Sequence, residues 1–498
     1  MVKILFLLHR YLGITIGLVM LLWTMSGIIM MYKQYPEIDH WEASSLKKNI
    51  ELDNCCKLPS SQILLDESFS KVQLEMLNSE PVLRLNTKDR GLISYQLSSG
   101  IAFNSIDQSR AKDIAENFVS DHYPGSAITG SFTLDNDQWT VSSRYHNHRP
   151  LFKFGLDNSE STEFYISSHT GSIVQITTSD QRLWGYLGAV IHWLYPTMLR
   201  QNTAVWAQVV IWLTIVGIFL TVTGLYIGIH QFWKRRNGRL SPYRGIVLYH
   251  HYSGLIFGIL TLTWVASGLL SMNPWGMLEG EGIADEYQRM TERELTWPEV
   301  EQVLTRLDTA PMTPDTVQLD ISVMAGEVSV IAHERNGNKQ RLHPESLQAY
   351  PYSLDELENL ARRLQPDSLI TSMQLITAAD YYYYVHHEPR EFPVYRVIIG
   401  DSQRRHYYLS PADGHILLKV DSNLRWYRWL FNGFHRGDFN KLTRSRPFWD
   451  SFMLSFLIGV TLVCGTGSYM GIRRLRIDLS RKRRDNKQTG SKVSEPMP

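Results

Sequence analysis

Four long apolar runs interrupt a sequence that is otherwise mixed in polarity. They cover residues 12–31, 204–229, 254–272 and 448–472, and Asp450, near the edge of the last run, is their only charged residue. Each run has roughly 20 or more residues, which an α-helix needs to cross a hydrocarbon core of about 30 Å at about 1.5 Å per residue. Helices buried in a soluble core rarely stay uncharged over such a length. The pattern therefore predicts four transmembrane helices.

Basic residues flank the apolar runs on one side. Lys3 and Arg10 precede the first run, and nine basic residues follow the last one, in the segment 473–498. The connection 231–245 contains no acidic residue and five basic ones: Lys234, Arg235, Arg236, Arg239 and Arg244. By the positive-inside rule we expect both termini and this loop to be cytoplasmic. Segments 33–200 and 273–447 would then be extracytoplasmic.

The first run is expected to remain as an uncleaved membrane anchor. It is too long for the apolar region of a signal peptide, and Tyr32, Lys33 and Gln34 follow it where a cleavage site would have small residues.

The overall charge balance conceals this polarity. The chain has 498 residues, with 50 Lys and Arg against 49 Asp and Glu. The basic flanks account for 16 basic and three acidic residues, which leaves 34 basic and 46 acidic residues elsewhere, a net of −12. Since the whole chain has no basic excess, we expect no nucleic-acid partner.

Three cysteines are too few for a disulfide scaffold. Cys464 lies in the fourth apolar run, and the adjacent Cys55 and Cys56 could close only a strained ring. We expect no redox role for this pair.

The two halves of the chain repeat one another. At a shift of 241 residues the first apolar run matches the third, in pairs that include His9/His250, Gly13/Gly254, Gly17/Gly258, Trp23/Trp264, Ser26/Ser267 and Gly27/Gly268. At a shift of 243 the second matches the fourth, in pairs that include His192/His435, Trp206/Trp449, Thr223/Thr466, Gly224/Gly467 and Tyr226/Tyr469. Two copies with the same orientation are usually related by a pseudo-twofold axis along the membrane normal.

The outer segments repeat as well. Residues 151–154 match 394–397, and alternating residues that end at Gly171 and Gly414 predict antiparallel hairpins. Apolar residues at helical spacing precede each hairpin, at about 109–123 and 353–364. The sequence thus predicts a membrane protein with four transmembrane α-helices in two parallel repeats and two extracytoplasmic α+β domains.

The predicted order along the chain has eight parts. They are transmembrane helix 1 (1–32), outer domain 1 (33–182), an amphipathic segment with helix 2 (183–230), a cytoplasmic loop (231–245), helix 3 (246–272), outer domain 2 (273–424), an amphipathic segment with helix 4 (425–472) and a basic cytoplasmic tail (473–498).

These motifs resemble a known family. The residues that carry the resemblance are 8–13 and 23–27, their second copy at 250–254 and 264–268, and the Thr-Gly-x-Tyr ends of the second and fourth helices. The chain resembles the PepSY-associated transmembrane proteins, also described as iron-regulated or PiuB-like, over about residues 1–476. The resemblance implies PepSY-like outer domains and a bacterial inner-membrane di-haem b protein that reduces ferric siderophore on the periplasmic side.

The repeated histidines can be interpreted from the sequence as well. A single histidine near a helix end is often only interfacial. His9/His250 and His192/His435 are the two pairs that the repeat relates, and equivalent residues near a pseudo-twofold axis face one another. A low-spin b-type haem needs two imidazoles on opposite faces, and Gly13, Gly17, Gly254 and Gly258 would let a flat ring approach. We therefore expect two haem b groups, with iron bound by His9, His250, His192 and His435.

Other ligands and metals are less favoured. His230 aligns with Arg473 and His251 with Arg10, so neither is repeated, although both remain alternatives if the axis is distorted. The histidine pairs bring no repeated cysteine or carboxylate that would complete a zinc or copper site.

The two pairs should lie at different depths. His9 precedes Trp23 by 14 residues, whereas His192 and His435 precede the second and fourth helices, on outer segments such as 183–194. Two haems at these depths would carry electrons across the lipid bilayer. The donor would be quinol or a cytoplasmic reductase, because the chain has no dinucleotide or nucleotide fingerprint.

Several aromatic and polar clusters have a simpler interpretation. His146, His148 and the run Tyr381 to Tyr384 with His386 and His387 could suggest a siderophore patch, but hairpins with alternating aromatic residues explain them. Six tryptophans at the outer helix ends (Trp184, Trp193, Trp206, Trp426, Trp429 and Trp449) fit an interfacial belt. Arg436, Arg444 and Asp438 could contact haem propionates or substrate.

Two functional hypotheses follow. The first is a haem-dependent ferric-siderophore reductase that converts Fe(III) to Fe(II) outside the membrane and so weakens the hold of hard oxygen ligands; no catalytic side chain is assigned. The second is a non-enzymatic PepSY membrane module that binds a protein partner or assists a transporter.

Overall fold

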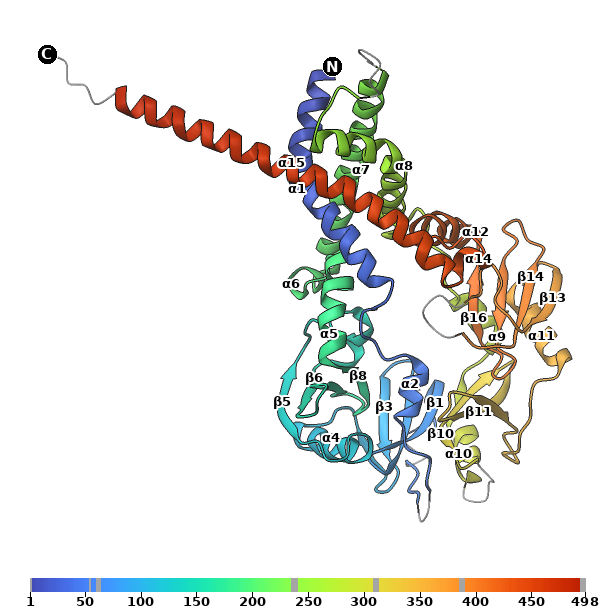
Figure 1. The fold of residues 1–498 in the computed structure, drawn as a ribbon. Coiled ribbons are helices and arrows are strands. Elements are labelled where there is room, and N and C mark those ends of the chain that lie inside the picture. The colour runs from blue at the N-terminus through green and yellow to red at the C-terminus, as the bar shows by residue number, and fades with distance from the viewer. Residues whose placement is uncertain are drawn as a thin grey trace. The chain divides into compact units, whose positions relative to one another are not determined.

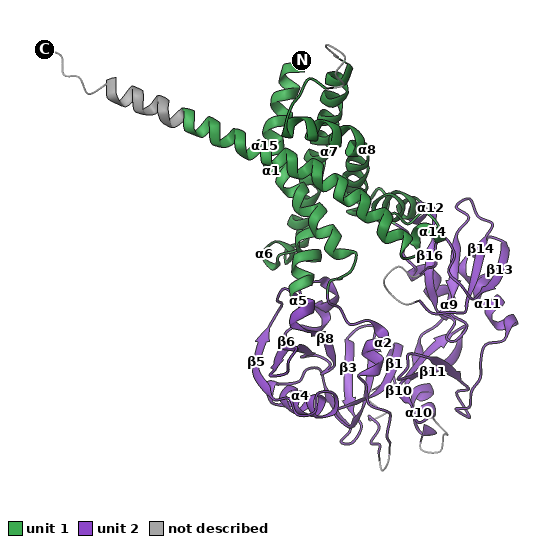
Figure 2. Cartoon of the chain, viewed as in Figure 1, with its two compact units in different colours: residues 1–35, 183–279, 426–498 green, residues 36–182, 280–425 purple. Residues whose placement is uncertain are grey.

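A computed structural model describes residues 2–52, 55–59, 64–233, 241–307, 313–384 and 390–492. The chain forms two compact units (Figure 2). The membrane unit comprises residues 1–35, 183–279 and 426–498, and the extramembrane unit comprises residues 36–182 and 280–425.

The membrane unit contains four long apolar helices (Figure 1): α1 (Val2–Met30), α7 (Thr203–Trp233), α8 (Ile246–Ser271) and α15 (Phe448–Lys492). Each contains a stretch long and apolar enough to cross a membrane, in α15 within Phe448–Arg481, which supports the prediction of four transmembrane helices. Helix α1 packs against α7 and α15, and α8 packs against the same two helices. This arrangement places α1 and α8 at opposite corners of a four-helix unit.

The α1 and α8 helices begin well before the apolar runs in the sequence. The apolar runs start at residues 12 and 254, whereas the helices start at Val2 and Ile246. His9 and His250 therefore lie within these two helices and not in the connections before them.

Short irregular helical segments precede α7 and α15. The first comprises α5 (Ser179–Gly185), the π-helical turn η2 (Tyr186–Val190) and α6 (Thr197–Arg200). The second comprises α12 (Ser422–Tyr427), the π-helical turn η5 (Arg428–Gly433), α13 (Phe434–Arg436) and α14 (Lys441–Arg444). Each π-helical turn ends two residues before a predicted ligand, His192 or His435. Such turns are rare and often occur at functional sites.

The largest sheet of the extramembrane unit has eight strands contributed by both halves of the chain. Its order is β12-β11-β10-β1-β2-β3-β4, with β9 also paired to β1. The strands are β1 (Ser68–Leu77), β2 (Glu80–Thr87), β3 (Gly91–Gln96), β4 (Ile101–Phe103), β9 (Leu295–Thr296), β10 (Thr316–Met324), β11 (Glu327–Glu334) and β12 (Lys339–Leu342).

The sequence predicted two separate outer domains, but this sheet joins strands from both segments. Strands β1 and β10 are antiparallel neighbours, and Gln73 pairs directly with Asp320. One face of the sheet packs into an apolar core that includes Phe69, Leu319 and Trp297, the last from helix α10 (Trp297–Leu304). Because β1 and β10 share hydrogen bonds and this core, segments 33–182 and 273–424 form one folded unit.

Two four-stranded antiparallel sheets complete this unit. One has the order β5-β6-β7-β8 and the other β13-β14-β15-β16. Their strands are β5 (Ile128–Leu134), β6 (Leu151–Leu156), β7 (Glu163–Ser167), β8 (Ile173–Thr177), β13 (Ile370–Ile376), β14 (Val394–Ile399), β15 (His406–Leu409) and β16 (Ile416–Val420). Helix α4 (Gln108–His122) packs on the first sheet and α11 (Leu354–Leu364) on the second. The predicted helices and repeated strands are thus confirmed, and the extramembrane unit is α+β.

Short helices make up the remaining described elements of this unit. They are α2 (His40–Ser45), α9 (Ala284–Thr291) and the 3-10 helix η1 (Ser143–His148), and the membrane unit has one further 3-10 turn, η3 (Pro274–Gly276).

The hairpin interpretation of the outer histidines and tyrosines is wrong. His146 and His148 lie in the 3-10 helix η1, and Tyr381 to Tyr384 lie in a loop after β13. Arg149 and Pro150 separate this 3-10 segment from β6, which begins at Leu151, so the two histidines precede the strand. His386 and His387 lie outside the described residues.

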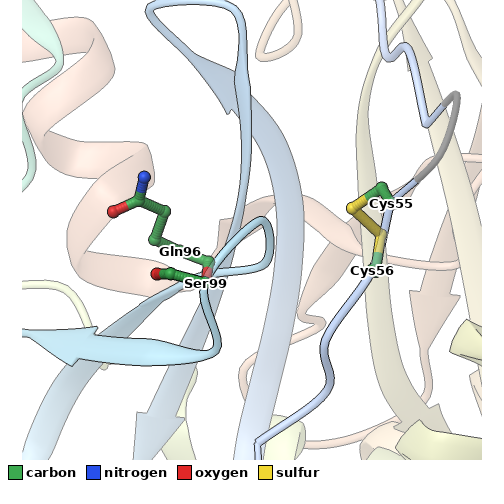
Figure 3. The surroundings of a disulfide bond; sticks show 4 residues. All are labelled: Cys55, Cys56, Gln96 and Ser99. Atoms are coloured by element: carbon green, nitrogen blue, oxygen red, sulfur yellow. A yellow bond between two sulfur atoms is a disulfide. The ribbon is translucent and has the colours of Figure 1, made fainter.

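Cys55 and Cys56 form a disulfide, with an S–S distance of 2.03 Å (Figure 3). The side chain of Cys55 packs against the core of the large sheet, and that of Cys56 is exposed. An adjacent pair was expected to close only a strained ring, and the structure closes it. Cys464 is a free buried thiol in α15.

The polar face of the large sheet holds buried charges. Glu75 on β1 is 7% exposed, and it accepts hydrogen bonds from Arg84 on β2 and from Lys47. Burial would raise the pKa of Glu75, but the charges and hydrogen bonds of Lys47 and Arg84 lower it to about 2. Removing one partner from such a buried group leaves the other charge uncompensated.

Replacement of Glu75 by Gln should destabilise the chain in a pH-dependent manner. The carboxylate stabilises the fold at pH values above its unfolded pKa of about 4.3, and this contribution is lost as the pH falls toward 2. We expect E75Q to lower the free energy of unfolding by about 3 kcal/mol at pH 7, and the difference from wild type to shrink by pH 3.

Unfolding of the detergent-solubilised full chain at several pH values measures this difference. Glu116→Gln is the matched control, because Glu116 is exposed in an i,i+4 pair with Lys112. An E75Q deficit that stays constant from pH 7 to pH 3 would contradict the assignment.

Candidate functional site

His9 and His250 face one another across the membrane unit. Their rings belong to the diagonally placed helices α1 and α8, and the ring centroids are 6.4 Å apart. Nδ1 of His9 lies 3.1 Å from the carbonyl oxygen of Leu220 and 3.5 Å from Oγ1 of Thr223, both on α7. Nδ1 of His250 lies 3.0 Å from Oγ1 of Thr466 on α15. Each ring is thus oriented by a neighbouring helix.

His192 and His435 form a second facing pair, with ring centroids 6.1 Å apart. Nδ1 of His192 lies 3.0 Å from the Trp23 carbonyl oxygen and 3.3 Å from Oγ of Ser26, both on α1. Nδ1 of His435 lies 3.2 Å from the equivalent atoms on α8, the Trp264 carbonyl oxygen and Oγ of Ser267. Equivalent residues of the two halves therefore make equivalent contacts.

The four hydroxyl groups determine which ring nitrogen carries the proton. Each donates its own hydrogen within its helix, as Ser26 does to Leu22 and Thr466 to Leu462, at 2.7 and 2.6 Å. The hydroxyl oxygen can then only accept, so the histidine Nδ1–H is the donor. This tautomer leaves a lone pair on Nε2, the arrangement found in metal-binding histidines. Among the described residues, none forms a hydrogen bond with Nε2 of these four rings.

Glycine makes room for each ring. Every one of these hydroxyl residues is followed by a glycine, in the pairs Ser26-Gly27, Thr223-Gly224, Ser267-Gly268 and Thr466-Gly467. A Cβ on Gly224 would lie 2.6 Å from Cε1 of His9, and one on Gly467 would lie 3.1 Å from Cε1 of His250. On Gly27 or Gly268 it would lie 3.4 Å from the corresponding atom of His192 or His435. A Ser/Thr-Gly dipeptide thus contacts each histidine: the hydroxyl accepts a hydrogen bond from Nδ1, and the glycine leaves space for Cε1.

The spacing of each pair fits two imidazoles on one metal ion. Two rings bound on opposite sides of an ion, each at about 2 Å, have centroids about 6 Å apart. The observed 6.4 and 6.1 Å match this value. A Cβ on Gly13 or Gly254, one turn after His9 and His250, would meet nothing within 4 Å, so there is room beside the first pair for a flat group.

The two pairs are separated along the helices. On α1, the level of His9 is 14 residues before Trp23, whose carbonyl contacts His192. At about 1.5 Å per residue this corresponds to about 21 Å. Residues 250 and 264 on α8 show the same separation.

The alternative ligands His230 and His251 are not placed as a pair. His251 uses both ring nitrogens, Nδ1 with Oγ of Ser241 at 2.8 Å and Nε2 with the Gly228 carbonyl at 2.9 Å. His230 stacks on Tyr226. The structure therefore brings together the repeated histidines and not the two unrepeated ones.

His192 and His435 lie outside the four spanning helices. Burial lowers the pKa of each, and the neighbouring His192 ring lowers that of His435 further. Both rings are neutral at neutral pH, which is the form that binds metals.

Charged groups beside His435 pair with one another. Asp438 is fully buried and interacts with Arg428 at 3.3 Å and Arg444 at 2.6 Å. Arg436 is exposed, with its guanidinium over the ring of Phe431. Among the described residues, no group of three or more His, Cys, Asp or Glu side chains converges on one point.

Sequence reasoning identified the histidine pairs but not the residues that orient them. The repeat includes the four hydroxyl residues that contact the histidines, and the glycine after each: Ser26, Ser267, Thr223 and Thr466. Repetition alone does not show that they contact the rings. Ser/Thr-Gly occurs at four repeat-related positions, one for each repeated histidine. This match in number is the sequence feature that could have predicted the contacts.

Comparison with known proteins identifies one family. The model described as "PepSY-associated TM region" matches residues 6–474, which is most of the chain. No curated protein matches the chain.

Substitution of Gly224 by Ala should disturb the position of His9. The new Cβ would overlap the imidazole, and we expect a loss of about 1–3 kcal/mol in stability. Gly465→Ala on α15 is the control, since its nearest atom would be 3.9 Å away and a helical Gly→Ala change otherwise tends to stabilise. Thermal unfolding of both variants in detergent measures the difference; equal melting temperatures would contradict the close packing of His9 on Gly224.

Proposed function

Because the chain belongs to the PepSY-associated transmembrane family, we propose that it is a di-haem b-type electron-transfer protein that reduces ferric siderophore. The observation that carries the proposal is the pair of facing histidine couples, with centroids 6.4 and 6.1 Å apart and every Nδ1 engaged elsewhere. His9 and His250 would hold one haem, and His192 and His435 the other. When bound, the haems supply one-electron transfer between the two ends of the helices.

The internal repeat supports this assignment. We interpret the chain as two parallel copies of one unit, each with helix, α+β segment and helix. His9 on Thr223 has its equivalent in His250 on Thr466, and His192 on Ser26 has its equivalent in His435 on Ser267. A repeat of this kind places two equivalent imidazoles opposite one another, and a b-type haem iron binds two imidazoles.

The charge distribution supports an orientation in the bacterial inner membrane. The basic loop 231–245 and tail 473–498 would be cytoplasmic, and the acidic extramembrane unit would be periplasmic. The His192–His435 pair would then lie toward the periplasm, where a ferric siderophore arrives. Iron reduced to Fe(II) is held less tightly by hard oxygen ligands and can leave the chelator.

The protein's own groups have defined tasks in this function. The carbonyl oxygens of Leu220, Trp23 and Trp264 and the four hydroxyls hold each imidazole through Nδ1 and leave Nε2 without a hydrogen bond among the described residues. A hydrogen bond from Nδ1–H also makes the ring a better electron donor to a metal. Apolar side chains from all four spanning helices pack together in the membrane unit.

Haem content and ligand pairing can be tested together. We expect the purified wild type to contain about two haems per chain, with a Soret band. Replacement of His9 or His250 by Ala should remove the same spectral component, and replacement of His192 or His435 the other, leaving about one haem in each case. His251→Gln is the control and should retain both.

Loss of one common component in the His9 and His192 variants would refute the pairing. Wild-type protein without haem after expression with sufficient haem would refute the electron-transfer proposal and favour the non-enzymatic PepSY module.

Reductase activity needs a separate measurement. Dithionite-reduced protein, freed of excess reductant, should be reoxidised by a ferric siderophore while a ferrous chelator captures one Fe(II) per electron released. The His192→Ala variant should lose most of this activity, at least tenfold. Reduced protein that stays reduced with every ferric siderophore tried would limit the function to electron carriage.

A further inference from the structure

Tyr226 and His230 form a pair that the proposed haem sites do not use. They lie one turn apart near the end of α7, with rings parallel to within 5° and centroids 6.0 Å apart. The Tyr226 side chain is 48% exposed on the surface of this apolar helix. Nε2 of His230 is buried and has no hydrogen-bond partner among the described residues. A buried polar atom without a partner is costly, so the pair is suited to a ligand that can satisfy this atom.

The pair adjoins the His9–His250 site through two sets of contacts. His251, which follows His250, forms a hydrogen bond through Nε2 to the carbonyl of Gly228, two residues before His230. Thr223, which contacts Nδ1 of His9, lies seven residues before His230 and so on the same face of α7. A ligand at His230 would be within two helical turns of the residues that hold this pair.

The second half of the chain keeps only part of this feature. The equivalents of Tyr226 and His230 on α15 are Tyr469 and Arg473. Tyr469 is 56% exposed on its helix, as Tyr226 is. The residues that hold a shared metal must be present in both copies, whereas a ligand that binds on one side needs only one. His230 is therefore present in the first half of the chain only, whereas the tyrosine beside it is present in both halves.

We propose that Tyr226 and His230 form the binding site for a membrane hydroquinone, which is the electron donor to the His9–His250 site. The inference rests on the proposed function and names its donor. A hydroquinone is a lipid-soluble aromatic ring with two hydroxyl groups, so it reaches an exposed helix face from the bilayer. Its ring packs against the exposed ring of Tyr226, and the His230 side chain turns toward it so that one hydroxyl donates a hydrogen bond to Nε2.

The chemistry balances with the groups present. Oxidation of one hydroquinone to quinone releases two electrons and two protons. Bound haems would take up the electrons one at a time. His230 would accept the proton of the hydroxyl that its Nε2 binds, pass it to solvent at the end of α7, and then accept and release the second hydroxyl proton in the same way. A soluble reductase would need neither a lipid-facing aromatic ring nor a proton acceptor inside the membrane unit.

The test compares His230→Gln with Arg473→Gln in the haem-loaded full chain. Glutamine preserves much of the size of the histidine but cannot accept the proton, and position 473 is the repeat-related control. Decylubiquinol is mixed with oxidised protein, and haem reduction is followed by absorbance. We expect rapid reduction of wild type and R473Q, and reduction at least tenfold slower in H230Q, with haem content and dithionite reduction unchanged.

A second readout does not depend on electron transfer. An azido-ubiquinone should photolabel α7 near His230 in wild type, including haem-free protein, and the label should fall several-fold in H230Q. Equal reduction rates and equal labelling in H230Q would overturn the site. Wild type that only a soluble reductase can reduce would overturn the hydroquinone as donor. A wild type without a Soret band would instead show, before any hydroquinone is added, that the proposed function itself is wrong.

Discussion

The fixed orientation of four imidazole rings is the constraint on which the membrane unit depends. His9 and His250 lie within apolar helices and His192 and His435 pack against them, so the protein must supply an acceptor for each ring N–H. It does so with helix carbonyls and with Ser or Thr hydroxyls that have already donated their hydrogen to their own helix. This single condition fixes the tautomer and attaches each ring to a neighbouring helix.

The glycine that follows each hydroxyl residue is part of the same condition. A ring held by a hydrogen bond to a helix must approach that helix closely, and a Cβ at the next position would lie 2.6 to 3.4 Å from Cε1. At Gly224 the overlap would be severe, and at Gly27 and Gly268 the fit would be tight but tolerable. Ser/Thr-Gly is therefore a contact motif for histidine. It occurs twice at the level of the His9–His250 pair and twice at the level of the His192–His435 pair.

The sequence predicted what depends on periodicity and repetition, and missed what depends on contacts between segments. Four helices, α4, α11 and the histidine pairs followed from patterns within the chain. The β1–β10 pairing could not be predicted, because the backbone groups at the edge of a strand form the same hydrogen bonds with a strand from either half. Tyr381 to Tyr384 were expected in a hairpin because aromatic residues favour strands on average, but they form a loop in which Tyr383 packs against residues of β14, β15 and β16.

The irregular helical segments before α7 and α15, which carry His192 and His435, show which features a histidine-pair site requires. The indole N–H of Trp206 donates to the Trp193 carbonyl, and that of Trp449 donates to the carbonyl of the equivalent residue, Arg436. The side chains that brace these segments nevertheless differ: Arg200 stacks on Tyr195 and Trp206 in the first half, whereas Arg428 and Arg444 pair with Asp438 in the second. Cation–π stacking and buried ion pairing thus support the same backbone path. The ligand geometry constrains where the chain runs and leaves the bracing chemistry free to diverge.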